Sequence, residues 1–198
     1  MKRSKPLKAQ SFRKLAALYQ RMDTAYAQAA EAMGLSCSGC TDNCCRTHFQ
    51  HHTYIEWAYL WKAISSAPAA RRQQLVDRAT DVVEQSRTIL AAGKRPRIMC
   101  PLNEEGLCAV YENRLMICRL HGVPNRFVLP NGSSREFPGC FKAQDLSQRA
   151  DRPALLDRTT FYRELAGLEQ AFLGNRRNSL PRVDMTLSEM LVLGPPPV

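Results

Sequence analysis

The chain has 198 residues, of which 44% are hydrophobic and 23% charged, and its formal net charge at pH 7 is +10. This length and composition are typical of one soluble globular domain, which buries enough apolar surface to fold without cross-links. No apolar run approaches the roughly 18 residues that a membrane-spanning helix needs, and no signal-peptide core follows the basic N-terminus. We therefore expect a cytoplasmic protein without a membrane partner.

Amphipathic helices are predicted for most of the first half of the chain. Apolar residues recur every three or four positions over residues 9–33, which predicts a long helix that ends at Gly34. A second helix is expected to begin at Thr53, which could form a capping box with Glu56. A third helix is predicted over residues 68–92 and is ended by a glycine. Its buried seam is expected to contain Leu75, Ala79, Val82, Ser86 and either Ile89 or Leu90.

The second half of the chain mixes short strands and helices. Residues 106–111 are rich in strand formers, and residues 126–137 hold an Asn-Gly pair between apolar residues, which predicts a hairpin or tight turn. Residues 143–152 are polar and are expected to form a connector. Residues 153–174 are predicted to form a helix with proline at its start and glycine at its end, and residues 186–193 a last short helix with a capping box.

These elements predict an α-rich fold with minor β, in which helices surround a cysteine-rich, irregular centre stapled by metal. We divide the sequence into three consecutive segments. Residues 1–36 form a basic N-terminal helix, and residues 37–142 form a cysteine-cluster metal-binding domain with inserted helices. Residues 143–198 form a C-terminal helical segment packed on that domain.

Four of the eight cysteines fall within nine residues, in the stretch CSGCTDNCC. In a reducing compartment, clustered thiols are metal ligands or redox groups more often than disulfides, and cysteines that only pack in a core would be scattered. A secreted disulfide framework is the alternative. We predict that the eight cysteines are metal ligands: Cys37, Cys40, Cys44, Cys45, Cys100, Cys108, Cys118 and Cys140. Gathering ligands from two remote stretches would couple metal binding to folding.

The donor type restricts the metal. All-thiolate sets favour Zn²⁺, Cu(I) or iron–sulfur clusters over Mg²⁺ or Ca²⁺. Cys37 and Cys40 are spaced to grip one metal, whereas the neighbours Cys44 and Cys45 would point to opposite sides of an extended backbone. Cys44 and Cys45 would therefore suit two different metal positions, or one of them would bind the metal while the other lies close to it. The thiols suffice without nitrogen ligands, so the four histidines, His48, His51, His52 and His121, are expected to be surface or loop residues.

The basic residues have two candidate roles. Arg46, Arg114 and Arg119 lie next to or near cysteines and could offset the negative charge of metal-bound thiolates. The basic residues that precede Asp23 could contact an acidic protein or a nucleic acid. The fold motifs of nucleic-acid binders are absent from the sequence, so a protein partner is the expectation.

Taken together, the cysteine motifs resemble the YkgJ-like cysteine-cluster family, which is described as a zinc- or iron-chelating domain of the CxxCxxCC type. The resemblance covers about residues 37–140. After the four-cysteine cluster, the matching residues are Cys100-Pro101-Leu102, then Cys108 with Tyr111, then Arg114 with Cys118 and Arg119. Two departures are the three residues between Cys40 and Cys44, and Leu115 where the family often has proline. The resemblance implies metal or iron–sulfur binding without a settled biochemical role.

Three functions are compatible with these residues. The first is a cytoplasmic iron–sulfur protein that serves electron transfer, metal handling or the maturation of a partner. The second is a structural Zn²⁺ module that presents a basic helical surface to a protein or nucleic-acid partner. The third is a metal-dependent protein-modifying enzyme. Neither a Gly-rich nucleotide loop nor a nucleophile elbow is found, and the adjacent Glu104 and Glu105 are expected to be solvated, which weighs against an enzyme.

Overall fold

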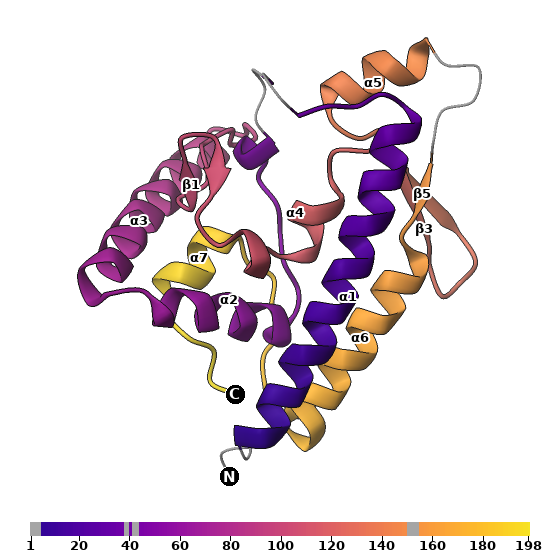
Figure 1. Cartoon of the computed structure of the whole chain (residues 1–198). Helices are drawn as coiled ribbons and strands as arrows, with labels where there is room; N and C mark the ends of the chain where they lie inside the picture. The colour runs from indigo at the N-terminus through magenta and orange to yellow at the C-terminus, as the bar shows by residue number, and fades with distance from the viewer. Residues whose placement is uncertain (1–4, 38–39, 41–43, 150–154) are drawn as a thin grey trace. The chain divides into compact units, whose positions relative to one another are not determined.

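The structure is a computed structural model that describes residues 5–37, 40, 44–149 and 155–198. Among these residues, seven α-helices alternate with three 3-10 helices and five short strands (Figure 1). The helices hold most of the described residues, which confirms an α-rich fold with minor β. The metal-stapled centre stays a prediction.

The described chain clusters into two compact units, and neither is continuous in the sequence. The first unit consists of Met1–Phe12, Cys45–Leu115 and Glu169–Val198. The second unit consists of Arg13–Cys44 and Met116–Leu168. Each unit therefore draws on all three of the consecutive segments 1–36, 37–142 and 143–198.

Helix α1 (Lys5–Ala32) confirms the long N-terminal helix and begins four residues before the predicted position. Its buried apolar residues follow helical spacing: Leu15, Leu18, Tyr19, Met22 and Ala30. The helix ends at Ala32, two residues before Gly34, whose φ of 66° lies in the left-handed region that favours glycine. The N–H of Leu35 then donates to the carbonyl of Ala30 at 2.8 Å, which closes the helix end.

In the first unit, helix α2 (Tyr54–Ser66) begins after Thr53 as predicted, but the predicted capping box is wrong. The Thr53 hydroxyl donates to the Glu56 carboxylate at 2.7 Å instead of accepting from the backbone. The carboxylate of Glu169 takes the place of the cap and accepts the N–H groups of Tyr54 and Ile55, each at 2.9 Å. The cap of α2 is therefore a carboxylate from a remote part of the chain and not the side chain of the adjacent Thr53.

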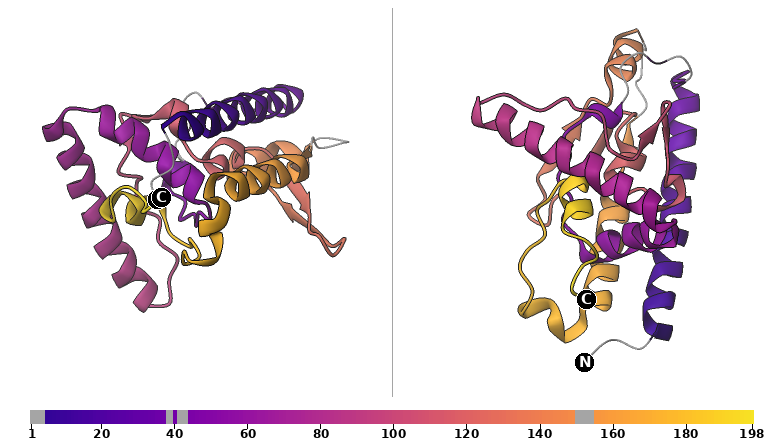
Figure 2. Two further views of the ribbon diagram at one scale, coloured as in Figure 1. Left: turned by 90° about the horizontal axis from the view of Figure 1, so that it is seen from below. Right: turned by 90° about the vertical axis from the view of Figure 1, so that its left-hand side faces the viewer.

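Helices α3 (Ala69–Ala91) and α7 (Leu187–Val192) complete the helical layer of the first unit, with α7 between α2 and α3 (Figures 1 and 2). Trp57 and Trp61 of α2 are buried and donate their indole N–H groups to the carbonyl of Met190 on α7, at 3.1 and 2.8 Å. The buried seam of α3 is Leu75, Ala79, Val83 and Ser86. The predicted seam is wrong at two positions, since Val83 and not Val82 is buried, and neither Ile89 nor Leu90 is buried.

The second unit contains a three-stranded sheet of order β4-β3-β5. Strands β3 (Asn125–Val128) and β4 (Ser134–Phe137) are antiparallel, with Val128 opposite Ser134, and they confirm the hairpin predicted around the Asn-Gly pair. Strand β5 (Leu156–Asp157) pairs with β3 in parallel.

Two predictions for residues 143–174 need correction. The expected connector is helical over most of its described length, because helix α5 (Phe141–Gln148) begins directly after Cys140. The sequence of α5 lacks the apolar stripe that reveals a helix, because Ala143 is its only buried residue. Helix α6 (Thr159–Leu173) ends before Gly174 as predicted but begins at Thr159. The proline proposed as its start, Pro153, lies outside the described residues.

The last short helix is confirmed with its cap. The Glu189 N–H donates to the Thr186 hydroxyl at 3.2 Å and the Thr186 N–H donates to the Glu189 carboxylate at 2.7 Å. The remaining short elements are η1 (Cys44–Arg46), β1 (Asn103–Glu104), β2 (Leu107–Cys108), η2 (Tyr111–Asn113), α4 (Met116–Leu120) and η3 (Gly174–Asn178).

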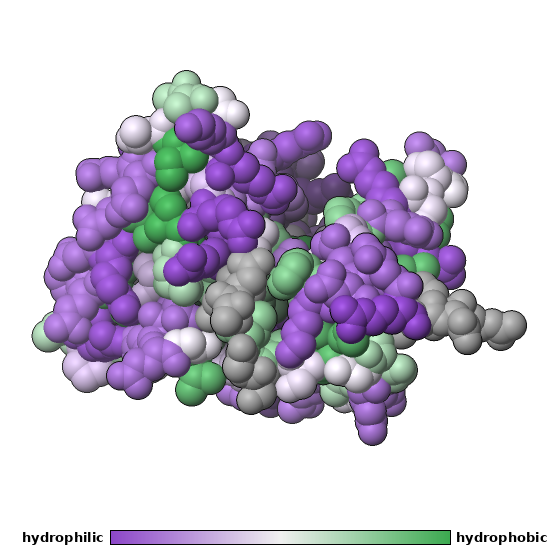
Figure 3. Space-filling model, turned by 90° about the horizontal axis from the view of Figure 1, so that it is seen from above, coloured by the Kyte–Doolittle hydropathy of each residue, from purple (hydrophilic) through white to green (hydrophobic). Residues whose placement is uncertain are grey.

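Polar residues cover most of the face drawn in Figure 3, with apolar residues scattered between them. Within the described residues, none of the helices combines the length and the apolar character that crossing a bilayer requires.

Candidate metal-binding cysteines

All eight cysteines belong to the described residues, and no disulfide joins any two of them. The boundary between the two units passes between the neighbours Cys44 and Cys45. The first unit holds Cys45, Cys100 and Cys108, which we call the first cysteine set. The second unit holds the other five, of which Cys37, Cys44 and Cys140 form the second cysteine set.

The first cysteine set is assembled by backbone hydrogen bonds. The N–H of Cys100 donates to the carbonyl of Cys45 at 2.9 Å, which ties the segment before β1 to the 3-10 turn η1. The N–H of Asn103 donates to the carbonyl of Cys100, also at 2.9 Å. Asn103 in turn pairs with Cys108 in the β1–β2 hairpin. Three cysteines from distant positions are thereby brought to one place in the first unit.

A tight turn sets the register of that hairpin. The two turn residues, Glu105 and Gly106, have φ values of 50° and 90°, as a two-residue type I′ turn requires. The side-chain oxygen of Asn103 accepts the N–H of Gly106 at 3.2 Å and holds the turn. Because a shift of one residue would turn Cys108 to the opposite face, this turn is what directs its thiol.

The environment of Cys100 favours the neutral thiol. The pKa of Cys100 is raised to about 12, chiefly by burial and to a lesser extent by the negative charges of Cys45 and Cys108. The N–H of Leu102 and the guanidinium of Arg78 act in the opposite direction, since both stabilise a thiolate. A metal ion that bound Cys100 at neutral pH would therefore have to displace its proton.

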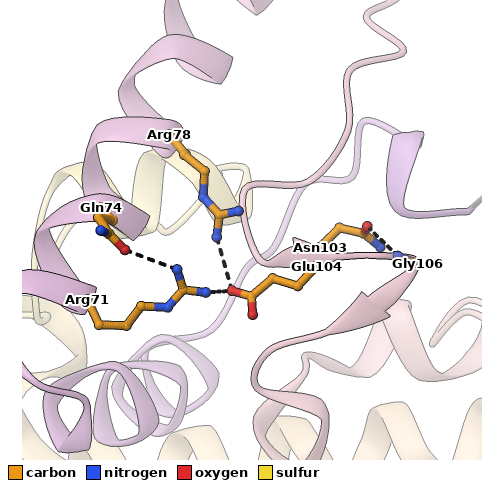
Figure 4. A network of polar contacts seen from close by, with 6 residues as sticks. All are labelled: Arg71, Gln74, Arg78, Asn103, Glu104 and Gly106. Atoms are coloured by element: carbon orange, nitrogen blue, oxygen red, sulfur yellow. Dashed lines mark hydrogen bonds and ion pairs between the residues drawn. The ribbon is translucent and has the colours of Figure 1, made fainter.

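Arg78 connects this site to helix α3. Figure 4 shows Arg71 and Arg78 of α3 converging on the carboxylate of Glu104 in β1, with Arg78 Nη2 at 3.3 Å from Glu104 Oε1. The expectation that Glu104 is merely solvated is therefore wrong. One carboxylate shared by two guanidinium groups leaves a positive charge beside Cys100. This network also anchors the hairpin that carries Cys108.

The second cysteine set lies near Tyr26 of α1. The Tyr26 hydroxyl lies 3.9 Å from the Sγ atom of Cys37. Burial raises the pKa of Tyr26, and the negative charges of Cys37, Cys140 and Cys44 raise it further. Cys140 occupies the N-cap position of α5 without a side-chain capping hydrogen bond, and its N–H donates to the carbonyl of Gly122 at 2.9 Å.

Cys40 and Cys118 are the remaining cysteines of the second unit. The N–H of Cys40 donates to the carbonyl of Cys37 at 3.2 Å, so the two residues share one turn of chain. Cys118 lies on α4 and is partly buried. Nowhere in the described part of the chain do three or more His, Cys, Asp or Glu side chains form a group already arranged to hold a metal ion.

The histidines and arginines singled out in the sequence have other roles. His51 is buried and not on the surface, and its backbone bridges to Met185 through hydrogen bonds of 2.8 and 3.2 Å. Arg119 is buried, forms an ion pair with Asp23 and stacks over the ring of Tyr19, with its Cζ atom 4.2 Å from the ring centre. The guanidinium of Arg114 stacks over Tyr111, and Arg46 is exposed at the end of η1.

Sequence reasoning missed Arg78 and Tyr26. Arg78 lies between the buried seam positions of α3, where a basic residue carries no special signal. Tyr26 belongs to the apolar stripe that predicts the helix over residues 9–33, so it reads as a core residue. No family model matches this chain, and no curated protein or solved structure shows significant similarity to it.

Proposed function

We propose that this protein binds a soft metal centre through cysteine thiolates, and that the centre is an iron–sulfur cluster. Such a centre would serve electron transfer, metal handling or the maturation of a protein partner. The proposal agrees with the resemblance to the YkgJ-like cysteine-cluster family and assumes a cytoplasmic location, where thiols stay reduced.

One observation carries the proposal, which is the convergence of Cys45, Cys100 and Cys108 in the first unit. The hydrogen bond from Cys100 to Cys45 joins residues that lie 55 positions apart, and the β1–β2 turn returns Cys108 to the same place. Cysteines that served only as small hydrophobic residues would have no reason to gather at one place in the fold with a cation beside them. Convergence of soft donors from remote segments is typical of metal sites that are coupled to folding.

Both units supply the type of donor that a thiolate-bound centre needs, and the cysteine side chains of the described residues would rearrange to form its ligand group. The first cysteine set offers three sulfurs, and the Leu102 N–H and Arg78 stabilise the negative charge that bound thiolates carry. The second cysteine set offers three more, with Cys40 and Cys118 as further donors from the same unit. An iron–sulfur cluster would supply one-electron chemistry, while the protein supplies the sulfurs, the charge compensation and the exclusion of water.

Anaerobic preparation of the full chain tests the proposal. We expect a brown protein with thiolate-to-iron absorption in the visible range, and with iron and acid-labile sulfide in comparable amounts. Cys100→Ser is expected to lose part of this absorption, whereas Ser66→Ala, an exposed hydroxyl on α2, is expected to retain all of it. A colourless protein with stoichiometric zinc would replace the cluster by the structural Zn²⁺ module. A chain that retains neither metal contradicts the proposal.

A further inference from the structure

The Tyr26 hydroxyl occupies a position that the surrounding backbone keeps open. A Cβ atom at residue 122 would lie 2.0 Å from the Tyr26 hydroxyl oxygen and 2.9 Å from its Cζ atom, so any residue other than glycine would displace the ring. Gly122 therefore provides the space in which the hydroxyl approaches Cys37. Ordinary packing of a tyrosine ring would not require a glycine at this position.

The same glycine fixes the position of Cys140. Its carbonyl accepts the N–H of Cys140, and Gly139 packs against that carbonyl so closely that a Cβ atom there would lie only 2.7 Å from the oxygen. Gly139 also has a φ of 80°, in the left-handed region. Gly122 thus contacts both the backbone of Cys140 and the hydroxyl of Tyr26. Lys142 adds a hydrogen bond of 2.6 Å to the carbonyl of Ser36, directly before Cys37.

We propose that Tyr26 is a positioning residue of the second cysteine set, and that its hydroxyl donates a hydrogen bond to the thiolate of Cys37 when that thiolate binds a metal. This inference rests on the proposed function. A tyrosine hydroxyl is an O–H donor at neutral pH, and a metal-bound thiolate is acceptor only. The contact of 3.9 Å is within reach for sulfur, and it would gain strength from the negative charge of a bound thiolate.

Such a bond would have two consequences for the metal. It would orient the Cys37 sulfur, as outer partners of metal ligands do, and their loss typically costs about 10- to 100-fold in metal affinity. It would also withdraw electron density from that sulfur. The thiolate-to-metal charge-transfer absorption would then lie at higher energy than in a site without the hydroxyl. The second consequence separates a hydrogen bond to sulfur from a purely structural role of the ring.

Cobalt(II) is a suitable probe, because thiolate-to-cobalt absorption reports sulfur coordination whether the native centre contains iron or zinc. The metal-free full chain is titrated anaerobically with cobalt(II), and the part of the absorption that belongs to the second set is the part that Cys37→Ser removes. For Tyr26→Phe we expect that part to move to longer wavelength, with about tenfold weaker binding. Gly122→Ala, which pushes the hydroxyl away while keeping it, is expected to produce the same displacement of the absorption.

Tyr162→Phe is the matched control, since it removes a phenolic hydroxyl elsewhere in the second unit and keeps the ring that packs on Phe127. It is expected to leave the wild-type spectrum unchanged. If wild type binds cobalt(II) through sulfur and Tyr26→Phe has the same spectrum and affinity, the role of Tyr26 is refuted and the proposed function stands. If wild type shows no sulfur-to-cobalt absorption, both are refuted.

Discussion

Arg78 acts on the first cysteine set from a helix that contains none of its cysteines. Its guanidinium contacts Glu104 and lowers the pKa of Cys100 against the larger effect of burial. The side chain therefore holds the β1–β2 hairpin, and it would compensate the negative charge of the thiolates if they bound a metal. The role of Arg78 depends on its position in α3 and not on its residue type, because other arginines of the same helix carry the same guanidinium group.

Replacing Arg78 by methionine is expected to weaken metal binding at the first set about tenfold. Without the cation, the pKa of Cys100 rises further, so its proton is harder to displace. The measurement is the dissociation constant for cobalt(II) at pH 7. Arg87→Met, which removes an exposed arginine of the same helix, serves as the control. Equal affinities for the two variants would exclude Arg78 from the site.

His51 is expected to make stability fall in acid. Burial, and to a lesser extent the positive charge of His52, lower its pKa from 6.5 to about 3. In that interval the unfolded chain binds a proton that the folded chain does not, so stability is retained above pH 6.5 and is lost as the pH falls towards 3. The loss should reach a few kcal/mol.

The free energy of unfolding, measured in urea across this pH range, tests the role of His51. His51→Gln should remove this part of the acid sensitivity, so its curve should be flatter than that of wild type. His52→Gln changes the exposed neighbour, whose Nδ1 atom lies 3.4 Å from Asp184 Oδ1, and should shift the wild-type curve only slightly, because His52 is the smaller cause of the lowered pKa of His51. Parallel curves for all three proteins would mean that His51 does not titrate in this interval.

At the scale of elements, the boundaries of most helices follow from local chemistry. Helix α7 carries its own capping box in Thr186 and Glu189, and α1 ends two residues before Gly34, a glycine with positive φ. These signals act over three or four residues, so they are visible in the sequence. Helix α2 differs because its cap, Glu169, is 115 residues from Tyr54. No local pattern reveals such a partner.

Glu169→Gln is expected to destabilise the protein by about 1 kcal/mol. Glutamine has one acceptor oxygen in place of two, so it can accept from Tyr54 or from Ile55 with a neutral oxygen but not from both as the carboxylate does. Glu164→Gln is the control on the same helix, since its ion pair with Arg21 is exposed to solvent and should contribute little to stability. Urea unfolding of both variants gives the comparison, and a larger loss for Glu164→Gln would contradict the cap.

At the scale of the whole molecule, each compact unit is built from segments that are remote in the sequence. A metal bound by the first cysteine set would cross-link residues near 45, 100 and 108 within the first unit. Because the unfolded chain does not hold these thiols together, metal binding would favour the folded state. Metal content and stability are therefore expected to change together.

Saturating cobalt(II), at about 100 times its dissociation constant, is expected to stabilise the chain by about 2.7 kcal/mol. The measurement is urea unfolding of the metal-free chain with and without cobalt(II), under anaerobic conditions. The double variant Cys45→Ser and Cys108→Ser should lose the part of this gain that belongs to the first set. Equal stability of wild type with and without cobalt(II) would show that folding and metal binding are independent.

The sequence by itself determined the long N-terminal helix, the Asn-Gly hairpin, the last capped helix and the list of eight candidate thiol ligands. Each of these depends on spacing or turn chemistry within a few residues, where physical cause and sequence pattern coincide. The sequence did not predict helix α5, because a helix with one buried residue has no apolar stripe to detect. Only the tertiary structure decided that Cys44 and Cys45 belong to different compact units, that Arg78 acts on Cys100 and that Tyr26 meets Cys37. Those contacts join segments through space, and the packing that creates them is a property of the whole chain.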